Sequence, residues 1–158
     1  MVWMTEAVFP PWNFSWVVPD RLAAMAWPQT VASLDYIIQQ GVRHLVTLSA
    51  EKLPPTHVFP QLRHTVISVL EFEAPTLDQI KQFIAICEVE DQNNEAVGVH
   101  CRMGRGRTGV MAACYLVRFA AQTPERAITS LRLTRPGSVE TYAQERVVLA
   151  YHDFLRAS

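Results

Sequence analysis

The chain has 158 residues, of which 49% are hydrophobic and 18% are charged, and its formal net charge is −1. This length suits one globular domain spanning residues 1–158, and the composition excludes disordered, collagen-like and coiled-coil proteins. The charge offers no basic field for nucleic acid, and no apolar run approaches the roughly 18 residues of a membrane span, so we expect a soluble, unsecreted protein without nucleic-acid binding or membrane insertion.

The first half of the chain alternates β-rich and helical patterns. Residues 14–18, 43–48 and 65–70 are rich in β-branched and aromatic side chains, which is typical of strands. Apolar residues at helical spacing between Val31 and Ile38 predict a helix that ends at Gly41. A capping box from Thr76 to Gln79 predicts the start of a second helix.

The second half continues the alternation. The short apolar run 96–100 predicts a buried strand, followed by a glycine-rich turn and a helix over about 107–121. Thr123 and Pro124 are typical of a helix start, and the last helix is expected over about 139–156. Strands alternating with helices indicate an α/β fold: a mostly parallel central sheet flanked by helices, with its ligand site beyond the carboxyl ends of the strands.

The three cysteines, Cys87, Cys101 and Cys114, are an odd number and lack the spacing of zinc ligands. Neither a disulfide framework nor a structural metal site is predicted, and we expect a reducing compartment, the cytoplasm and also the nucleus. Cys87 and Cys114 fall on predicted helical faces, where they are expected in the core. Cys101 lies instead between a strand and a helix, which makes it the candidate for chemistry.

Residues 100–109 read His-Cys-Arg-Met-Gly-Arg-Gly-Arg-Thr-Gly and link the predicted buried strand to the next helix. Glycines at 104 and 106 allow a tight turn whose backbone N–H groups converge on one centre, and the helix adds its positive end there. Arg107 can present a planar fork to two oxygens of a phosphate group. A thiol in that field ionises easily, so Cys101 is expected to be a thiolate near neutral pH and a nucleophile for phosphorus.

The segment resembles the signature of the protein tyrosine phosphatase superfamily, in which His-Cys, five residues and then Arg-Ser/Thr-Gly define the active site. Four further stretches resemble small atypical dual-specificity phosphatases of the VHZ type, so that nearly the whole chain is covered. They are residues 13–17, 41–46, 95–101 and 135–142. The resemblance implies hydrolysis of phosphotyrosine, phosphoserine and phosphothreonine in proteins through a phosphocysteine, without metal or other cofactor.

The resemblance also implies a role for each position of the loop. Cys101 would be the nucleophile and Arg107 the phosphate clamp, and Thr108 would offer its hydroxyl to the sulfur while the phosphocysteine breaks down. His100 would support the loop from below by a hydrogen bond. The substrate phosphate would be bound by His100, Arg102, Met103, Gly104, Arg105, Gly106 and Arg107.

The general acid is where the sequence departs from the family. The family has an aspartate at the position of Glu71, and the neighbouring Glu73 could substitute for it. Glu140 opens a segment that resembles the glutamine loop of tyrosine phosphatases, where it could serve as a second acid or base. Gln144 stands at the position that orients the hydrolytic water.

Other functions stay open at this stage. Arg102 and Arg105 add charge beside the loop, which favours a phosphoinositide phosphatase as the alternative, whereas the altered acid position would suit a phosphopeptide-binding pseudophosphatase. A reductase or sulfurtransferase would need a resolving thiol or another loop length. We expect a monomer that takes phosphorylated proteins or peptides as substrates and binds phosphate-like oxyanions in the loop.

Overall fold

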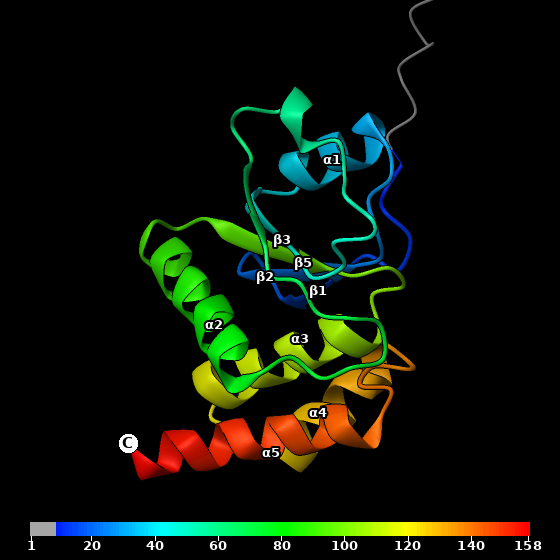
Figure 1. Ribbon diagram of the computed structural model, residues 1–158. Coiled ribbons are helices and arrows are strands. Elements are labelled where there is room, and N and C mark those ends of the chain that lie inside the picture. Colours follow the sequence, from blue (N-terminus) through cyan, green and yellow to red (C-terminus); the bar gives the residue numbers. More distant parts are fainter. Residues whose placement is uncertain (1–8) are drawn as a thin grey trace, which may run out of the picture.

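The computed structural model describes residues 9–158, which fold into five strands, five α-helices and one short 3₁₀ turn (Figure 1). In chain order these are β1 (Ser15–Val18), β2 (Leu22–Met25), α1 (Val31–Gln39), β3 (Val42–Thr47), the turn η1 (Thr56–Val58), β4 (Arg63–Val66), α2 (Leu77–Gln92), β5 (Ala96–His100), α3 (Gly106–Phe119), α4 (Pro124–Thr134) and α5 (Tyr142–Ala157).

The five strands form one sheet in the order β1-β2-β5-β3-β4. Only β1 is antiparallel to its neighbour, so the prediction of a mostly parallel sheet is confirmed. The four parallel strands end level with one another, since Met25 is paired with His100, His100 with Thr47, and Thr47 with Val66. Consequently the four segments that leave these strands meet at one edge of the sheet.

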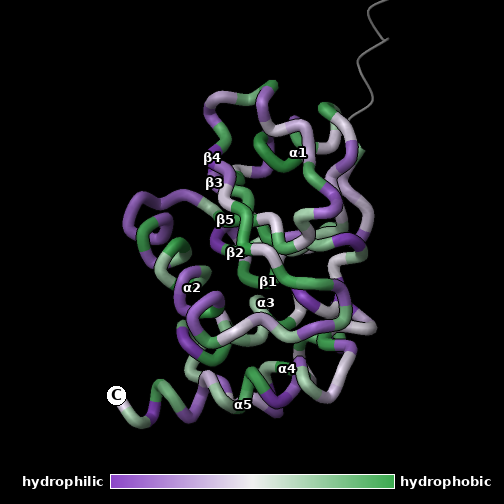
Figure 2. Tube along the Cα trace, in the orientation of Figure 1, coloured by the Kyte–Doolittle hydropathy of each residue, from purple (hydrophilic) through white to green (hydrophobic). Residues whose placement is uncertain are grey.

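Helices cover both faces of the sheet. Helix α1 lies on one face, and α2 and α3 lie on the other, with α4 and α5 packed behind α3 (Figure 1). Two buried apolar clusters result, the larger between the sheet and α2–α5 and the smaller beneath α1. Helix α3 is buried almost throughout, which agrees with the apolar colouring of the centre in Figure 2. Within residues 9–158, no helix is long and apolar enough to span a membrane.

Several predicted helix ends are confirmed by their capping geometry. The side chain of Thr76 accepts from the Gln79 backbone N–H, while the Gln79 side chain accepts from the Thr76 backbone N–H, which completes the capping box. The side chain of Thr123 accepts from the Arg126 backbone N–H and so caps α4, with Pro124 at the first helical position. Gly41 follows α1 with φ +106°, a left-handed conformation that costs glycine little.

The sequence prediction differs from the structure in three places. Strand β2 is not predicted, because its four residues, Leu-Ala-Ala-Met, carry no β-branched side chain. Strand β4 covers 63–66 rather than 65–70, although the backbone N–H groups of Ile67 and Val69 still donate to the carbonyls of Thr47 and Leu48. Helix α5 begins at Tyr142 instead of about 139, because Val139 has φ +62° and cannot belong to a right-handed helix.

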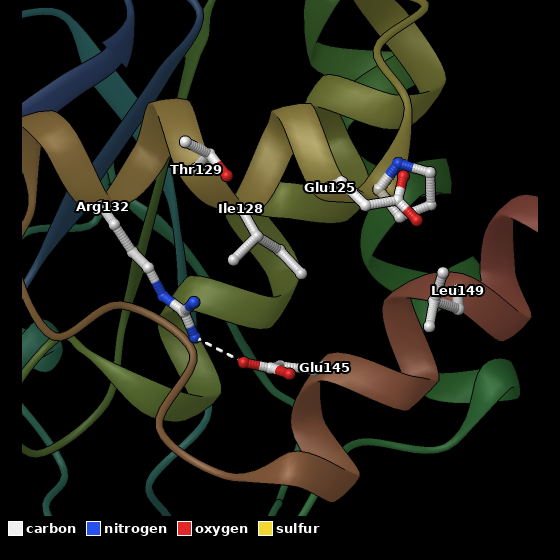
Figure 3. Close-up of a pocket in the computed structure, with 7 residues that line it drawn as sticks. Glu125, Ile128, Thr129, Arg132, Glu145 and Leu149 are labelled. Atoms are coloured by element: carbon white, nitrogen blue, oxygen red, sulfur yellow. Dashed lines mark hydrogen bonds and ion pairs between the residues drawn. The ribbon is translucent and has the colours of Figure 1, made fainter.

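Helices α4 and α5 leave a shallow groove of about 220 Å³ between them (Figure 3). An ion pair of 2.8 Å between Arg132 and Glu145 crosses it. Arg132 also donates to the carbonyls of Ser138 and Val139, so the groove borders the turn that precedes α5. The groove is lined by Pro124, Glu125, Ile128, Thr129, Arg132, Glu145 and Leu149.

Candidate active site

The segment 101–107, which we call the cradle loop, leaves the central strand β5 and enters α3 at the edge where the parallel strands end. Three other segments meet it there. Trp27 follows β2 and donates its backbone N–H to the carbonyl of Arg102 at 3.2 Å. Glu51 follows β3, and residues 69–75, which we call the acid loop, follow β4. The sheet topology therefore gathers the predicted residues from distant parts of the chain.

The carbonyl groups of the cradle loop are held from outside. The Cys101 carbonyl accepts from His100, and the Met103 carbonyl accepts from the Asn13 side chain. The Gly104 carbonyl accepts from Asn13 and from Arg135. The Arg105 carbonyl accepts from two backbone N–H groups, those of Gly109 and Val139. Anchoring the carbonyls outward leaves the opposite side of the peptide units, which carries the N–H groups, for the interior of the loop.

Within the described part of the chain, no backbone N–H from 102 to 107 donates to a protein acceptor. Helix α3 begins here without a side-chain cap, so its positive end is directed at the same centre. Gly104 makes the winding possible: it has φ +73°, and a Cβ atom there would meet the backbone of Met25 at 2.6 Å. A ring of unused donors at a helix start is suited to an anion of tetrahedral shape.

Arg107 is the buried cation of the cradle loop, with 3% exposure. Its two Nη atoms donate to the two carboxylate oxygens of Glu51 at 3.2 and 3.0 Å, and Nη1 also donates to the Val69 carbonyl at 2.8 Å. Burial opposes ionisation of Glu51, but the hydrogen bonds and charge of Arg107 outweigh it and lower the pKa of Glu51 below 4.5. Sequence reasoning missed Glu51, because an acid on a loop after a strand carries no motif.

His100 lies beneath the loop and is fully buried. Burial lowers its pKa to about 3, so the ring is neutral at physiological pH and has one N–H. Its Nδ1 is 3.2 Å from the Cys101 carbonyl and therefore carries the proton, while Nε2, 2.7 Å from the Thr47 hydroxyl, accepts. His64 lies 2.6 Å beyond on the same hydroxyl and extends the chain of hydrogen bonds. The predicted hydrogen bond from His100 to the loop is therefore present.

Cys101 and Thr108 are both buried at the base of the cradle loop. The Thr108 hydroxyl has no hydrogen-bond partner within the described residues, so it is available to a sulfur or oxygen in the cradle. Cys87 and Cys114 are buried in the core, and burial raises the pKa of both thiols well above the ordinary value. The three cysteines thus differ in surroundings, and only Cys101 belongs to the anion cradle.

The acid loop is fastened to the cradle loop at two points and to helix α5 at a third. The carboxylate of Glu71 lies 3.4 Å from Nη1 of Arg102, and both side chains are partly exposed. The Val69 carbonyl accepts from Arg107, and the Glu73 carbonyl accepts from the Gln144 side chain at 3.1 Å. The structure therefore brings Glu71 to the rim of the cradle, whereas only the backbone of Glu73 takes part in these contacts.

Glu140 and Gln144 lie against the cradle loop at Gly106. A Cβ atom at position 106 would collide with a carboxylate oxygen of Glu140 and meet the amide of Gln144 at 2.9 Å. Gln144 is fully buried and also accepts from the backbone N–H groups of Glu140 and Thr141. Glu140 thus precedes α5 and its cap, Thr141, and belongs to the turn before the helix.

The two remaining arginines of the loop lie at its rim. The guanidinium of Arg105 lies 5.5 Å from the ring centre of Trp12, and Arg102 is paired with Glu71. A third cation, Lys52, lies 4.8 Å from the ring centre of Trp27. The mouth of the cradle therefore carries three positive side chains, of which sequence reasoning identified two.

Comparison with known proteins agrees with this arrangement. Residues 11–148 match the family model described as a Swiss Army Knife protein, DSP-PTPase phosphatase domain. The dual specificity protein phosphatase CDC14C of Symphalangus syndactylus is 28% identical over 87% of this chain, and the phosphatidylglycerophosphate phosphatase PTPMT1 of Arabidopsis thaliana is 30% identical over 83%. The chain spans 31% and 40% of the lengths of these two relatives.

Solved structures extend the likeness of fold. Tk-PTP in the active form superimposes with a TM-score of 0.81 at 22% identity, over 89% of this chain and 97% of that one. PTPMT1 in complex with PI(5)P superimposes with a TM-score of 0.82 at 21% identity, over 92% of this chain and 99% of that one. At these identities the solved structures support the fold alone. The family model covers residues 11–148, which include both the cradle loop and the acid loop. The expectation of a dual-specificity phosphatase is thereby confirmed at the level of the family: the chain belongs to the DSP-PTPase phosphatase domain family.

Proposed function

We propose that this protein is a metal-independent phosphomonoester hydrolase that works through a phosphocysteine on Cys101. The observation that carries the proposal is the cradle loop, whose carbonyls are anchored outward and whose N–H groups from 102 to 107 meet no acceptor among residues 9–158. Within it a thiol, a buried guanidinium and a hydroxyl without a partner in the described part of the chain meet at the start of α3. Such a site stabilises the charge of a phosphoryl group in transfer.

In the first step the Cys101 thiolate attacks phosphorus, so that the S–P bond forms while the bond to the leaving oxygen breaks. The N–H groups and Arg107 bind the three equatorial oxygens. The leaving oxygen takes a proton from a carboxylic acid. In the second step a water positioned by Gln144 attacks phosphorus and gives its proton to the carboxylate left by the first step, while the S–P bond breaks and the Thr108 hydroxyl donates a hydrogen bond to the departing thiolate.

We assign the general acid to Glu71, which the acid loop holds at the rim of the cradle. Glu140 is the second candidate, because its carboxylate lies directly against Gly106 of the cradle loop. The two assignments differ in one measurable respect. Replacing the true acid by Gln should slow the hydrolysis of an alkyl phosphate by a factor of roughly 10²–10⁴. It should barely affect the hydrolysis of an activated aryl phosphate, because that leaving group needs no proton.

For the substrate we propose phosphotyrosine and phosphoserine or phosphothreonine in proteins, as expected of a small phosphatase of the VHZ type. The relative CDC14C is named a dual specificity protein phosphatase. A lipid phosphate is the second candidate, because cations Arg102, Arg105 and Lys52 surround the cradle and PTPMT1 was crystallised with PI(5)P. We further propose a monomer located in the cytoplasm and nucleus.

Turnover measured side by side on phosphotyrosine peptide, phosphothreonine peptide and PI(5)P, with EDTA present, tests the proposal. We expect phosphate release from the peptides to be unaffected by EDTA and to be lost in Cys101→Ser, which should still bind vanadate. A pseudophosphatase would bind phosphopeptide without releasing phosphate. A preference for PI(5)P over both peptides would replace the protein substrate by a lipid while leaving the phosphocysteine reaction intact.

A further inference from the structure

Arg135 is a buried cation that the proposed reaction does not use. It follows α4 and is 2% exposed, the largest side chain to be buried so completely within residues 9–158. Its Nη2 donates to the Gly104 carbonyl of the cradle loop at 2.7 Å. Its Nη1 donates to the Asn13 carbonyl at 2.6 Å, the Ser15 hydroxyl at 2.7 Å and the Ala24 carbonyl at 3.2 Å. The guanidinium thus joins the cradle loop to β1, β2 and the segment before them.

None of these four acceptors carries a charge. Across residues 9–158, no ion pair includes Arg135, and its Nε has no hydrogen-bond partner. The other buried arginine of the site, Arg107, is by contrast paired with both oxygens of Glu51. A buried charge without a counter-ion is costly, and proteins that keep one usually have an opposite charge to stabilise.

The negative charge that can balance Arg135 arises in the cradle. Burial lowers the pKa of Arg135 to about 10, and the negative charge of Cys101 acts against that lowering. The side chain therefore stays protonated at neutral pH. Electrostatic stabilisation is mutual, so an anion that favours the charged form of Arg135 is itself favoured by it.

Arg135 differs from the other cations near Cys101 in being fully buried without a carboxylate partner among the described residues, whereas Arg105 and Lys52 are half-buried and lie over aromatic rings at the mouth. Arg107 and Arg102 are each paired with a carboxylate, and Glu140 brings a further negative charge beside Gly106. His100 is neutral. The charged and titratable groups that face the cradle from the surrounding elements are Glu51, Lys52, Glu71, His100, Arg102, Arg105, Arg107, Arg135 and Glu140.

We propose that Arg135 is a positioning residue whose buried, unneutralised charge holds the cradle loop through Gly104 and stabilises the anion formed within it, first the Cys101 thiolate and then the phosphoryl group. The inference rests on the proposed phosphocysteine reaction. It adds the buried charge of Arg135 to that of the phosphate clamp, Arg107. A residue with only a structural role would affect folding without altering the ionisation of Cys101.

The test compares Arg135→Met, which removes the charge, with Arg135→Lys, which keeps it. Arg118→Met is the matched control, because Arg118 is paired with Glu88 at the far end of α3. The rate of Cys101 alkylation by iodoacetamide is followed against pH, with the label located by mass spectrometry. We expect Arg135→Met to raise the midpoint of this profile by about one pH unit. The same variant should weaken vanadate binding about tenfold, because the bound anion loses the same stabilisation as the thiolate.

Arg135→Lys should recover most of the wild-type midpoint, and Arg118→Met should leave it unchanged. A folded Arg135→Met protein with the wild-type midpoint would overturn the inference, as would an Arg135→Lys protein whose midpoint rises as far as that of Arg135→Met. If Cys101 of the wild-type protein does not ionise at a lower pH than the other two thiols, or if the wild-type protein releases no phosphate, the proposed function itself is contradicted.

A second pair of variants decides the question if Arg135→Met does not fold. Ser15→Asp places a carboxylate against the guanidinium and neutralises it in place, while Ser15→Asn adds nearly the same volume without charge. We expect Ser15→Asp to melt at or above the temperature of Ser15→Asn, yet to raise the alkylation midpoint by about one pH unit relative to it. Equal midpoints in the two variants would contradict the inference.

Discussion

Glu51 offers the sharpest test of how the clamp is held, because no sequence motif singles it out. Its carboxylate accepts from both Nη atoms of Arg107 at 3.0 and 3.2 Å, but it is 46% exposed. Hydrogen bonds to charged groups contribute roughly 1.5–3 kcal/mol when buried, and exposure reduces this to about 1–2 kcal/mol. Glu51→Ala should therefore lower the melting temperature by about 2–8 °C in a domain of this size.

The same change should lower kcat/KM for an aryl phosphate by about 10- to 100-fold, because a guanidinium without its orienting partner no longer meets the phosphoryl oxygens in the required geometry. Glu88→Ala is the matched control: its carboxylate pairs with Arg118 at 2.9 Å on the surface, where such pairs contribute little. Steady-state kinetics and thermal melting of both variants check the prediction. Equal effects of Glu51→Ala and Glu88→Ala would refute the reasoning.

The ionisation of Glu51 makes the stability of the folded protein depend on pH. Arg107 lowers the folded-state pKa of Glu51 below its ordinary value of 4.5, so the stabilisation is fully present above pH 4.5 and is lost as the pH falls through the lowered value. In urea unfolding, wild type should exceed Glu51→Gln in stability at pH 7, and the difference should shrink below pH 4.5. A difference that persists at pH 2 would show that ionisation of Glu51 is not its source.

Two further predictions concern the cradle and its thiol. Gly106→Ala should reduce kcat at least about 100-fold while leaving a folded protein, since the added methyl group displaces Glu140 or the loop itself; a variant with more than a tenth of wild-type kcat would contradict the tight contact. Cys101 should be alkylated and oxidised before Cys87 and Cys114, whose thiols burial keeps protonated; earlier labelling of either core cysteine in a mass-spectrometric time course would contradict this order.

The sequence predicts the elements that carry strong local signals. The capping box at Thr76 and the Thr-Pro start at 123–124 fix helix ends through side chains that lie next to them in the chain. The strand before Cys101 is recognisable because it is short, apolar and followed by glycines. In each case neighbours in sequence determine the structure, so no knowledge of distant contacts is needed.

Other features depend on contacts that the sequence does not display. Val139 takes a left-handed conformation with φ +62°, and its N–H donates to the Arg105 carbonyl, which delays the start of α5 to Tyr142. Glu51 and Arg135 join the site only because the sheet brings their segments to the cradle loop. The family pattern therefore predicts the residues of the loop, and the fold is needed to find the residues that hold them.

The phosphocysteine itself is the most direct test of the proposed reaction. Thr108→Ala removes the hydroxyl that has no partner in the described part of the chain, and it should slow breakdown of the intermediate more than its formation. With ³²P-labelled phosphotyrosine peptide, EDTA and rapid acid quenching, we expect label on Cys101 at a higher level in Thr108→Ala than in wild type. Phosphate release by a protein that never carries label on Cys101, or carries it on another residue, would contradict the account.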